Sequence, residues 1–107
     1  MKKVNINPLS VNKAWKGRRF KTDDYHSYER ELLFILPSLT VPKGFLSIFI
    51  VFGFSSKLKD IDNPLKLFID VLQKKYKFND RDIYKLTVEK RIVKKKEEYI
   101  LFKINEL

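Results

Sequence analysis

Two stretches of the chain place apolar residues at the three- and four-residue spacing of an amphipathic helix. The first is residues 22–36, where Thr22 suits an N-cap and Pro37 forbids continuation. Its apolar stripe comprises Tyr25, Tyr28, Leu32 and Ile35. The second runs from Pro64, which suits a first helical position after the capping residue Asn63, to about residue 76. Its stripe comprises Leu65, Phe68, Ile69, Leu72 and Tyr76.

The remaining patterned segments are typical of β-strands. Residues 45–54 are apolar on both faces, which indicates a central strand that is covered on both sides. Residues 84–93 alternate apolar and polar positions, residues 99–104 have one apolar face, and the lysine-rich residues 94–97 between them predict the turn of a C-terminal β-hairpin. Residues 1–6 read as a short extended start. The predicted fold is a single α+β domain over residues 1–107, a mixed sheet with two helices in the order β, basic hairpin or loop, α, β, α, β, β.

The composition excludes several classes of site. The 107 residues contain no cysteine, which rules out disulfides and thiolate metal sites, and the single histidine argues against zinc. The longest apolar run, residues 45–54, is too short for a bilayer, which needs roughly 20 residues, and polar asparagines follow the basic start. We therefore expect a soluble cytoplasmic protein with no membrane partner.

A formal net charge of +10 indicates a polyanionic partner, most often a nucleic acid. No helix shows the basic face opposite an aromatic face that favours an anionic membrane surface, while a solvated lysine-rich surface remains the plain alternative. The candidate phosphate contacts are Lys13, Lys16, Arg18 and Arg19, around a turn at Gly17, together with Lys57 and Lys59. We expect the aromatic residues within the first group, Trp15 and Phe20, to pack on the core.

Acidic residues gather at two places in this basic chain. Asp60 and Asp62 precede the second helix, and Asp80 precedes the strand predicted at 84–93. If residues 60–62 are extended, both carboxylates point to one side, and a strand pairing beside 45–54 would bring Asp80 to the same end of the sheet. The plain interpretation is that these acids only cap a helix and begin a turn.

The chemical interpretation is a magnesium site that cuts DNA. Magnesium prefers hard oxygen ligands and combines a few carboxylates with phosphate oxygens of the substrate. It acidifies a bound water and stabilises charge on a phosphate under attack. Lys66, in the first turn of the second helix, would neutralise that phosphate or assist the leaving group, and the helix N-terminus adds positive partial charge.

The pattern Asp60-x-Asp62-Asn63-x-x-Lys66, followed by an apolar helix and Asp80, resembles the RusA family of Holliday-junction resolvases, endodeoxyribonucleases of bacteria and their prophages. Lys59 stands where the family often has a basic residue before the first aspartate. Residues 7–21 also look like the family's N-terminal region. The chain departs from the family in its second acidic segment, which reads N-D-R-D over residues 79–82 where many members have two adjacent aspartates. Asp80 is aligned with the family's metal-binding acid, and Asp82 is the alternative.

The resemblance implies an α+β homodimer with two active sites that nicks two strands of a four-way DNA junction symmetrically, in recombination and repair. It implies that Asp60, Asp62 and Asp80 hold magnesium or manganese, that Lys66 assists catalysis, and that no small-molecule cofactor is needed. Two other classes stay open: a non-catalytic DNA- or RNA-binding module, which needs no metal, and an interaction protein whose charge serves only solubility.

Overall fold

The structure is a computed structural model that describes residues 1–10, 15–16 and 20–107, with side chains for residues 1–10 and 22–107. Its elements, in chain order, are β1 (Lys2–Val4), β2 (Trp15–Lys16), β3 (Phe20–Lys21), α2 (Asp23–Ile35), β4 (Leu46–Phe54), α3 (Leu65–Tyr76), the 3-10 turn η1 (Asp80–Asp82), β5 (Ile83–Ile92) and β6 (Tyr99–Glu106). The expected α+β class, with a mixed four-stranded sheet and two helices, is confirmed. None of the helices in the described ranges has the length and apolar character needed to cross a membrane.

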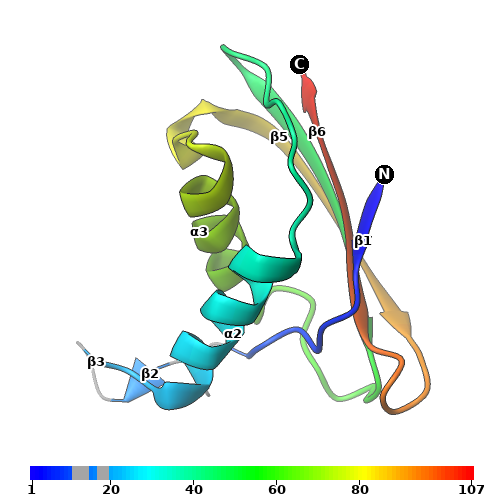
Figure 1. Ribbon diagram of the computed structural model, residues 1–107. Coiled ribbons are helices and arrows are strands. Elements are labelled where there is room, and N and C mark those ends of the chain that lie inside the picture. The colour runs from blue at the N-terminus through cyan, green and yellow to red at the C-terminus, as the bar shows by residue number, and fades with distance from the viewer. Residues whose placement is uncertain (11–14, 17–19) are drawn as a thin grey trace.

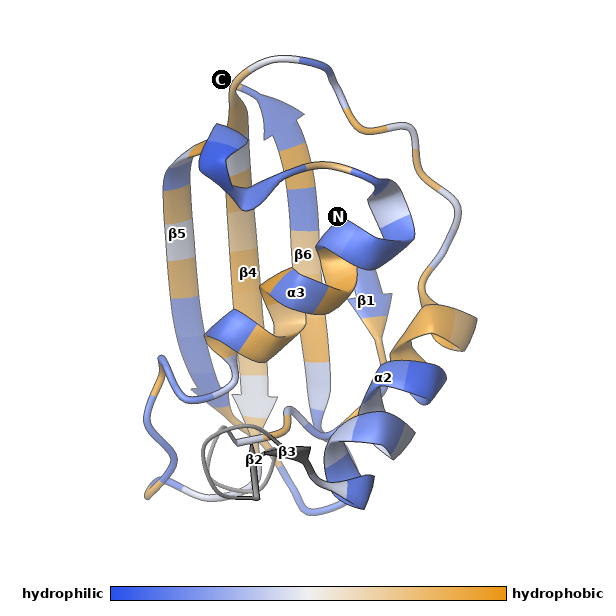
Figure 2. Ribbon diagram, turned by 90° about the vertical axis from the view of Figure 1, so that its left-hand side faces the viewer, coloured by the Kyte–Doolittle hydropathy of each residue, from blue (hydrophilic) through white to orange (hydrophobic). Residues whose placement is uncertain are grey.

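Strand β4 is the centre of the main sheet, as expected. The strand order is β1-β6-β4-β5, which Figure 2 shows from right to left behind the helices. β4 pairs antiparallel with β6 on one side and parallel with β5 on the other. β1 adds an antiparallel edge by pairing with β6, so the first and last strands of the chain are neighbours. The opposite edge of the sheet is β5.

The expectation of a C-terminal hairpin is wrong, because β4 lies between β5 and β6. Residue Ile50 of β4 stands opposite Val88 of β5 and Phe102 of β6 in register. The apolar β4 thereby gains a hydrogen-bonded neighbour on each edge, which satisfies its backbone groups in the interior. An alternating pattern fixes which face of a strand is buried but not which strand it pairs with, so the sequence could not exclude this arrangement.

The first helix forms where the pattern predicts it. The hydroxyl oxygen of Thr22 accepts a hydrogen bond from the backbone N–H of Tyr25 at 3.2 Å, and Asp23 and Asp24 lie in the first turn, where negative charge suits the helix dipole. Tyr25, Tyr28 and Leu32 are buried, as expected from their spacing. α2 therefore covers the sheet with the stripe that the sequence indicated.

Helix α3 begins one residue later than predicted, and the capping role expected for Asn63 is wrong. The N-cap is Pro64, and no side chain caps this end. Two successive tight turns lead into the helix instead: the carbonyl of Asp60 accepts from the N–H of Asn63 at 3.3 Å, and that of Asp62 accepts from Leu65 at 3.2 Å. The second turn satisfies the N–H of Leu65, the first of the four helical N–H groups that have no partner within the helix.

Both helices lie on one face of the sheet, which Figure 1 shows from the side and Figure 2 from the front. The core forms between them, where Ile48, Ile50 and Phe52 of β4 meet Phe68 of α3 and Phe102 of β6. The expectation that β4 is covered on both faces is wrong, because no described element lies over the other face. That face is called the open face below; by register it comprises Lys3, Ser47, Phe49, Val51, Gly53, Lys85, Thr87, Glu89, Arg91, Tyr99, Leu101, Lys103 and Asn105.

Candidate functional site

Asp60 and Asp62 lie in the loop that follows β4, and both are exposed. Their carbonyls accept hydrogen bonds from residues three positions further on, so the segment is turned rather than extended. The period-two argument that placed both carboxylates on one side requires extended backbone, and it does not apply here.

Asp80 lies in η1, directly before β5, which pairs beside β4 as expected. The expectation that this brings Asp80 to the same end of the sheet as Asp60 is wrong. Ile83 stands opposite Leu46, the first residue of β4, whereas Asp60 follows the last residues of β4. Parallel strands start at the same end, so residues before the second strand and residues after the first lie at opposite ends. Helix α3 spans the distance between them.

Lys66, in the first turn of α3, nevertheless contacts the segment that carries Asp80. Its ammonium lies 3.0 Å from Oδ1 of Asp70 and 3.4 Å from Oδ2 of Asp80. Lys66 and Asp70 are four residues apart on α3, the spacing at which helical side chains are neighbours. Asp80 is 14 residues away in sequence and reaches Lys66 because η1 folds back against the helix. Three residues from two elements thus form one charged cluster, which we call the Lys66 cluster.

The side chain of Gln73 links η1 to α3 by hydrogen bonds beside this cluster. Its side-chain oxygen accepts a hydrogen bond from the backbone N–H of Asp80 at 2.8 Å. Its amide nitrogen donates to Oδ1 of Asp70 at 3.4 Å and to the carbonyl of Ile69 at 3.5 Å. The side chain of Asn79 accepts from the N–H of Arg81 at 3.0 Å and caps η1 from the other side. These contacts hold Asp80 in reach of Lys66.

The electrostatics of the cluster favour the charged form of Lys66. The hydrogen bond to Asp70 is the largest cause that raises the pKa of the Lys66 ammonium above its usual value, and Asp80 adds to it. Lys66 is also about two-thirds exposed, at 67%. It is therefore protonated at neutral pH and cannot accept a proton, and its positive charge is engaged by the carboxylates of Asp70 and Asp80.

A groove of about 280 Å³ lies beside the Lys66 cluster, between α3 and β5. It is lined by Lys66, Ile69, Asp80, Ile83, Tyr84, Lys85 and Leu86. The lining combines the charged side chains Lys66, Asp80 and Lys85 with apolar ones, and the ring of Tyr84 packs on that of Phe45 with centroids 4.1 Å apart. A lining that mixes cationic and apolar side chains fits a ligand with both anionic and flat apolar parts.

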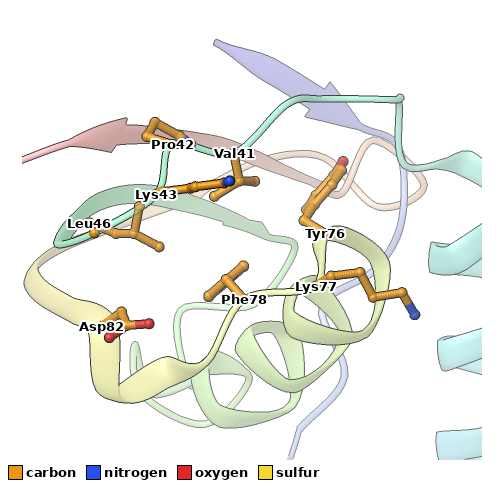
Figure 3. A pocket seen from close by; sticks show the side chains of 9 residues that line it. Val41, Pro42, Lys43, Leu46, Tyr76, Lys77, Phe78 and Asp82 are labelled. Atoms are coloured by element: carbon orange, nitrogen blue, oxygen red, sulfur yellow. The ribbon is translucent and has the colours of Figure 1, made fainter.

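Asp82, the alternative to Asp80, faces a different cavity. It lines a cavity of about 320 Å³. Figure 3 shows the Asp82 side chain there together with those of Val41, Lys43 and Phe78. Asp80 contacts Lys66, and no contact between Asp82 and Lys66 is found among the described side chains. The arrangement supports Asp80 over Asp82 as the acid that accompanies Lys66.

The predicted phosphate contacts are only partly described. Lys57 is exposed and Lys59 half-buried, both in the loop before Asp60. The carbonyl of Lys57 accepts a hydrogen bond from the ammonium of Lys90 at 2.9 Å, which ties this loop to β5. The backbones of β2 and β3 pair antiparallel, which supports a hairpin for the basic N-terminal segment. Lys13, Arg18, Arg19 and the side chain of Lys16 lie outside the described residues.

The acids fit magnesium in chemical type but not in grouping. Exposed carboxylates such as Asp60, Asp62 and Asp80 are the hard oxygen donors that magnesium prefers. Within the described part of the chain, however, no group of three or more His, Cys, Asp or Glu side chains is arranged to hold a metal ion. Asp80 is instead paired with Lys66, and Asp60 and Asp62 stay on their own loop.

Asp70 of the Lys66 cluster and the neighbouring Gln73 did not enter the prediction as site residues. The signal for Asp70 was present, since Lys66 and Asp70 have the four-residue spacing of a helical ion pair. Gln73 carried no such signal, because its partner Asp80 comes from η1, whose position depends on the tertiary fold. Comparison of the chain with protein-family models and with curated proteins gives no match.

Proposed function

We propose that this protein is a magnesium-dependent endodeoxyribonuclease that nicks two strands of a four-way DNA junction symmetrically. The observation that carries the proposal is the contact between Lys66 and Asp80 at 3.4 Å. These residues belong to the two separate segments that the sequence pattern links to one function, and the fold brings them together. The net charge of +10 adds a long-range attraction for DNA.

Lys66 acts in this proposal as a fixed positive charge. Because its pKa is raised, it stays protonated, and it would neutralise a DNA phosphate that takes the place of one of its two carboxylate partners in the groove. Asp70 and Gln73 would position Lys66 and Asp80, respectively. The carboxylates proposed to hold magnesium or manganese are those of Asp60 and Asp62 on one loop, because the third acid of the pattern, Asp80, lies at the opposite end of the sheet and pairs with Lys66. A metal held there would supply an acidified water molecule and charge stabilisation on the phosphate.

The same proposal includes a homodimer in the cytoplasm of a bacterium, encoded by the host or a prophage. A four-way junction has two-fold symmetry, so paired nicks require two active sites related by the same symmetry. No small-molecule cofactor takes part. The second candidate is a non-catalytic nucleic-acid-binding module, which the separation of Asp60 and Asp62 from Asp80 favours, because such a module needs no metal site.

The test is the variant Asp62→Asn with Asp24→Asn as its matched control. Asp24 is an exposed aspartate in the first turn of α2, away from the groove, and the substitution makes the same change of charge. We expect Asp62→Asn to lower the rate of cleavage of a labelled four-way junction in magnesium by at least about 100-fold. Junction binding without metal should be unchanged or tighter, because one repulsion of phosphate is removed. The control should cleave normally.

A magnesium titration of the unaltered protein separates the two candidates. Cleavage that rises with magnesium, together with calorimetric binding of magnesium that Asp62→Asn weakens, supports the endonuclease. Junction binding without cleavage at any magnesium or manganese concentration supports the binding module. Full cleavage activity in Asp62→Asn contradicts the assignment of this residue to the site.

A further inference from the structure

We propose that the open face of the sheet is a second DNA-binding surface, which holds the backbone of a duplex arm through Lys3, Lys85, Arg91 and Lys103. The register of the sheet places all four side chains on the face opposite the helices. The single acid on this face is Glu89, whose carboxylate lies 3.1 Å from the guanidinium of Arg91. The inference deepens the proposed endonuclease activity and rests on it for the identity of the substrate.

Helix α2 and the open face carry charge of opposite sign, whereas α3, which covers the same face of the sheet as α2, carries Lys66, Lys74 and Lys75 against Asp70. Helix α2, on the covered side, carries the four acids Asp23, Asp24, Glu29 and Glu31 against the single cation Arg30. The open face carries four cations against one acid. A polyanion is therefore attracted to the open face more than to α2. On α3, Lys66 and Lys74 are already paired with carboxylates, which leaves the open face with the larger share of unneutralised cations among these surfaces.

The open face suits phosphates better than bases or a second copy of this chain. Tyr99 is only 9% exposed, and Phe49 and Leu101 are half-buried, so few ring faces are available for base stacking. Val51, at the centre, is fully buried by its neighbours. Two such faces packed together would oppose like charges over little exposed apolar area. Sequence-independent contact with the phosphates of a duplex backbone needs no exposed rings and opposes no like charges.

The surface is continuous with the groove at the Lys66 cluster. Lys85 belongs to the open face by register and also lines the groove, so the edge strand β5 joins the two. Lys85 and Arg91 are six residues apart on β5, which corresponds to roughly 20 Å along a strand. That span matches about six base pairs at 3.4 Å each. A junction has arms that diverge from its centre, so one arm can lie on the open face while a strand at the crossover occupies the groove.

The experiment compares two double variants with the same change in net charge. Lys85→Glu with Lys103→Glu alters the open face, and Lys43→Glu with Lys77→Glu alters exposed lysines at the other cavity. Binding to a fluorescent linear duplex is measured without metal over a series of salt concentrations. We expect the open-face variant to bind at least about 10-fold more weakly than the control, with a salt slope smaller by about 2, since each lost phosphate contact removes about 0.9.

Equal weakening in both variants overturns the inference, because it shows a general charge effect. Loss of binding to phosphatidylserine vesicles with unchanged duplex binding also overturns it. If the charge reversals unfold the protein, judged by circular dichroism, Lys85→Gln with Lys103→Gln is compared with Lys43→Gln and Lys77→Gln. The binding assay does not depend on cleavage. A wild-type protein that does not cleave junctions would therefore contradict the endonuclease proposal without affecting the test of the open face.

Discussion

At the scale of single residues, the contact between Gly53 and Tyr99 shows how closely the open face is packed. The two residues are partners in the pairing of β4 with β6. A Cβ at position 53 would lie 2.6 Å from Cε1 and 2.7 Å from Cδ1 of Tyr99. The ring of Tyr99 therefore lies over the backbone of Gly53. The ammonium of Lys3, on β1, lies 4.8 Å from the centroid of the same ring. Glycine is needed here for close approach, although it otherwise weakens a strand.

We predict that Gly53→Ala lowers the free energy of unfolding by about 1–3 kcal/mol, because the ring of Tyr99 must move to admit a methyl group. Chemical denaturation measures this difference. The same substitution made in a Tyr99→Val background is the control. There the clash is absent, so alanine should cost nothing or stabilise the strand relative to glycine. An equal loss in both backgrounds would show that the ring contact is not the cause.

At the scale of elements, the position of Asp80 depends on how η1 docks on α3. The only described hydrogen bond from the Asp80 backbone goes to the side chain of Gln73, at 2.8 Å. Gln73 therefore connects the acid before β5 to the helix that carries Lys66. Without it, the N–H of Asp80 would lose its described partner, and the remaining contacts of Asp80 would be the hydrogen bond that its carbonyl accepts from the N–H of Ile83 and an exposed ion pair, which contributes little.

We predict that Gln73→Met raises the rate of amide hydrogen exchange at Asp80 by about 3- to 10-fold, since one hydrogen bond is worth about 0.5–1.5 kcal/mol. Methionine has a similar length but offers no strong acceptor. Gln73→Glu keeps an acceptor for the Asp80 N–H but replaces the amide that donates to Asp70 by a carboxylate oxygen, so exchange should be slower than in Gln73→Met and faster than in the unaltered protein. Unchanged exchange in Gln73→Met would mean that η1 is held by other contacts. Nuclear magnetic resonance resolves the single amide.

Local features were predictable from sequence, whereas pairing between distant segments was not. The Thr22 cap and the limits of α2 follow from nearby residues, and both are confirmed. The insertion of β4 between β5 and β6, and the separation of Asp80 from Asp60, depend on which strands pair. Side-chain alternation carries no information about that choice. The Lys66–Asp80 contact arises from the same tertiary arrangement. Lys66 and Asp80 could each be recognised from the sequence, but the contact between them could not.

At the scale of the whole molecule, three tyrosines make the free energy of unfolding depend on pH in the alkaline range. Burial raises the pKa of Tyr25 and Tyr28 above the usual value, and it raises the pKa of Tyr76 to about 12. The hydroxyl of Tyr76 donates a hydrogen bond to the carbonyl of Pro37 at 2.6 Å, which links α3 to the segment after α2. The folded protein thus holds protons that the unfolded chain releases above about pH 10.

We predict that the free energy of unfolding is insensitive to these groups below about pH 9 and falls as pH rises through about 10 towards 12. The sign follows from the raised pKa: the unfolded state binds fewer protons in this window, so increasing pH favours unfolding. Denaturation at a series of pH values measures the slope. Tyr76→Phe should be less stable at neutral pH, through loss of the Pro37 hydrogen bond, and should show a shallower alkaline decline. An identical decline would assign the effect to other groups.

The place of β6 in the sheet has a consequence for the order of events during folding. β6 pairs with both β1 and β4, so it joins the two halves of the sheet although it comes last in the sequence. Val4 finds its partner Ile100 only after 95 intervening residues have been made. During synthesis on the ribosome, α2, β4, α3 and β5 can assemble first, but β1 stays unpaired until β6 emerges. Closure of the sheet is therefore a late, long-range step, of the kind that slows folding.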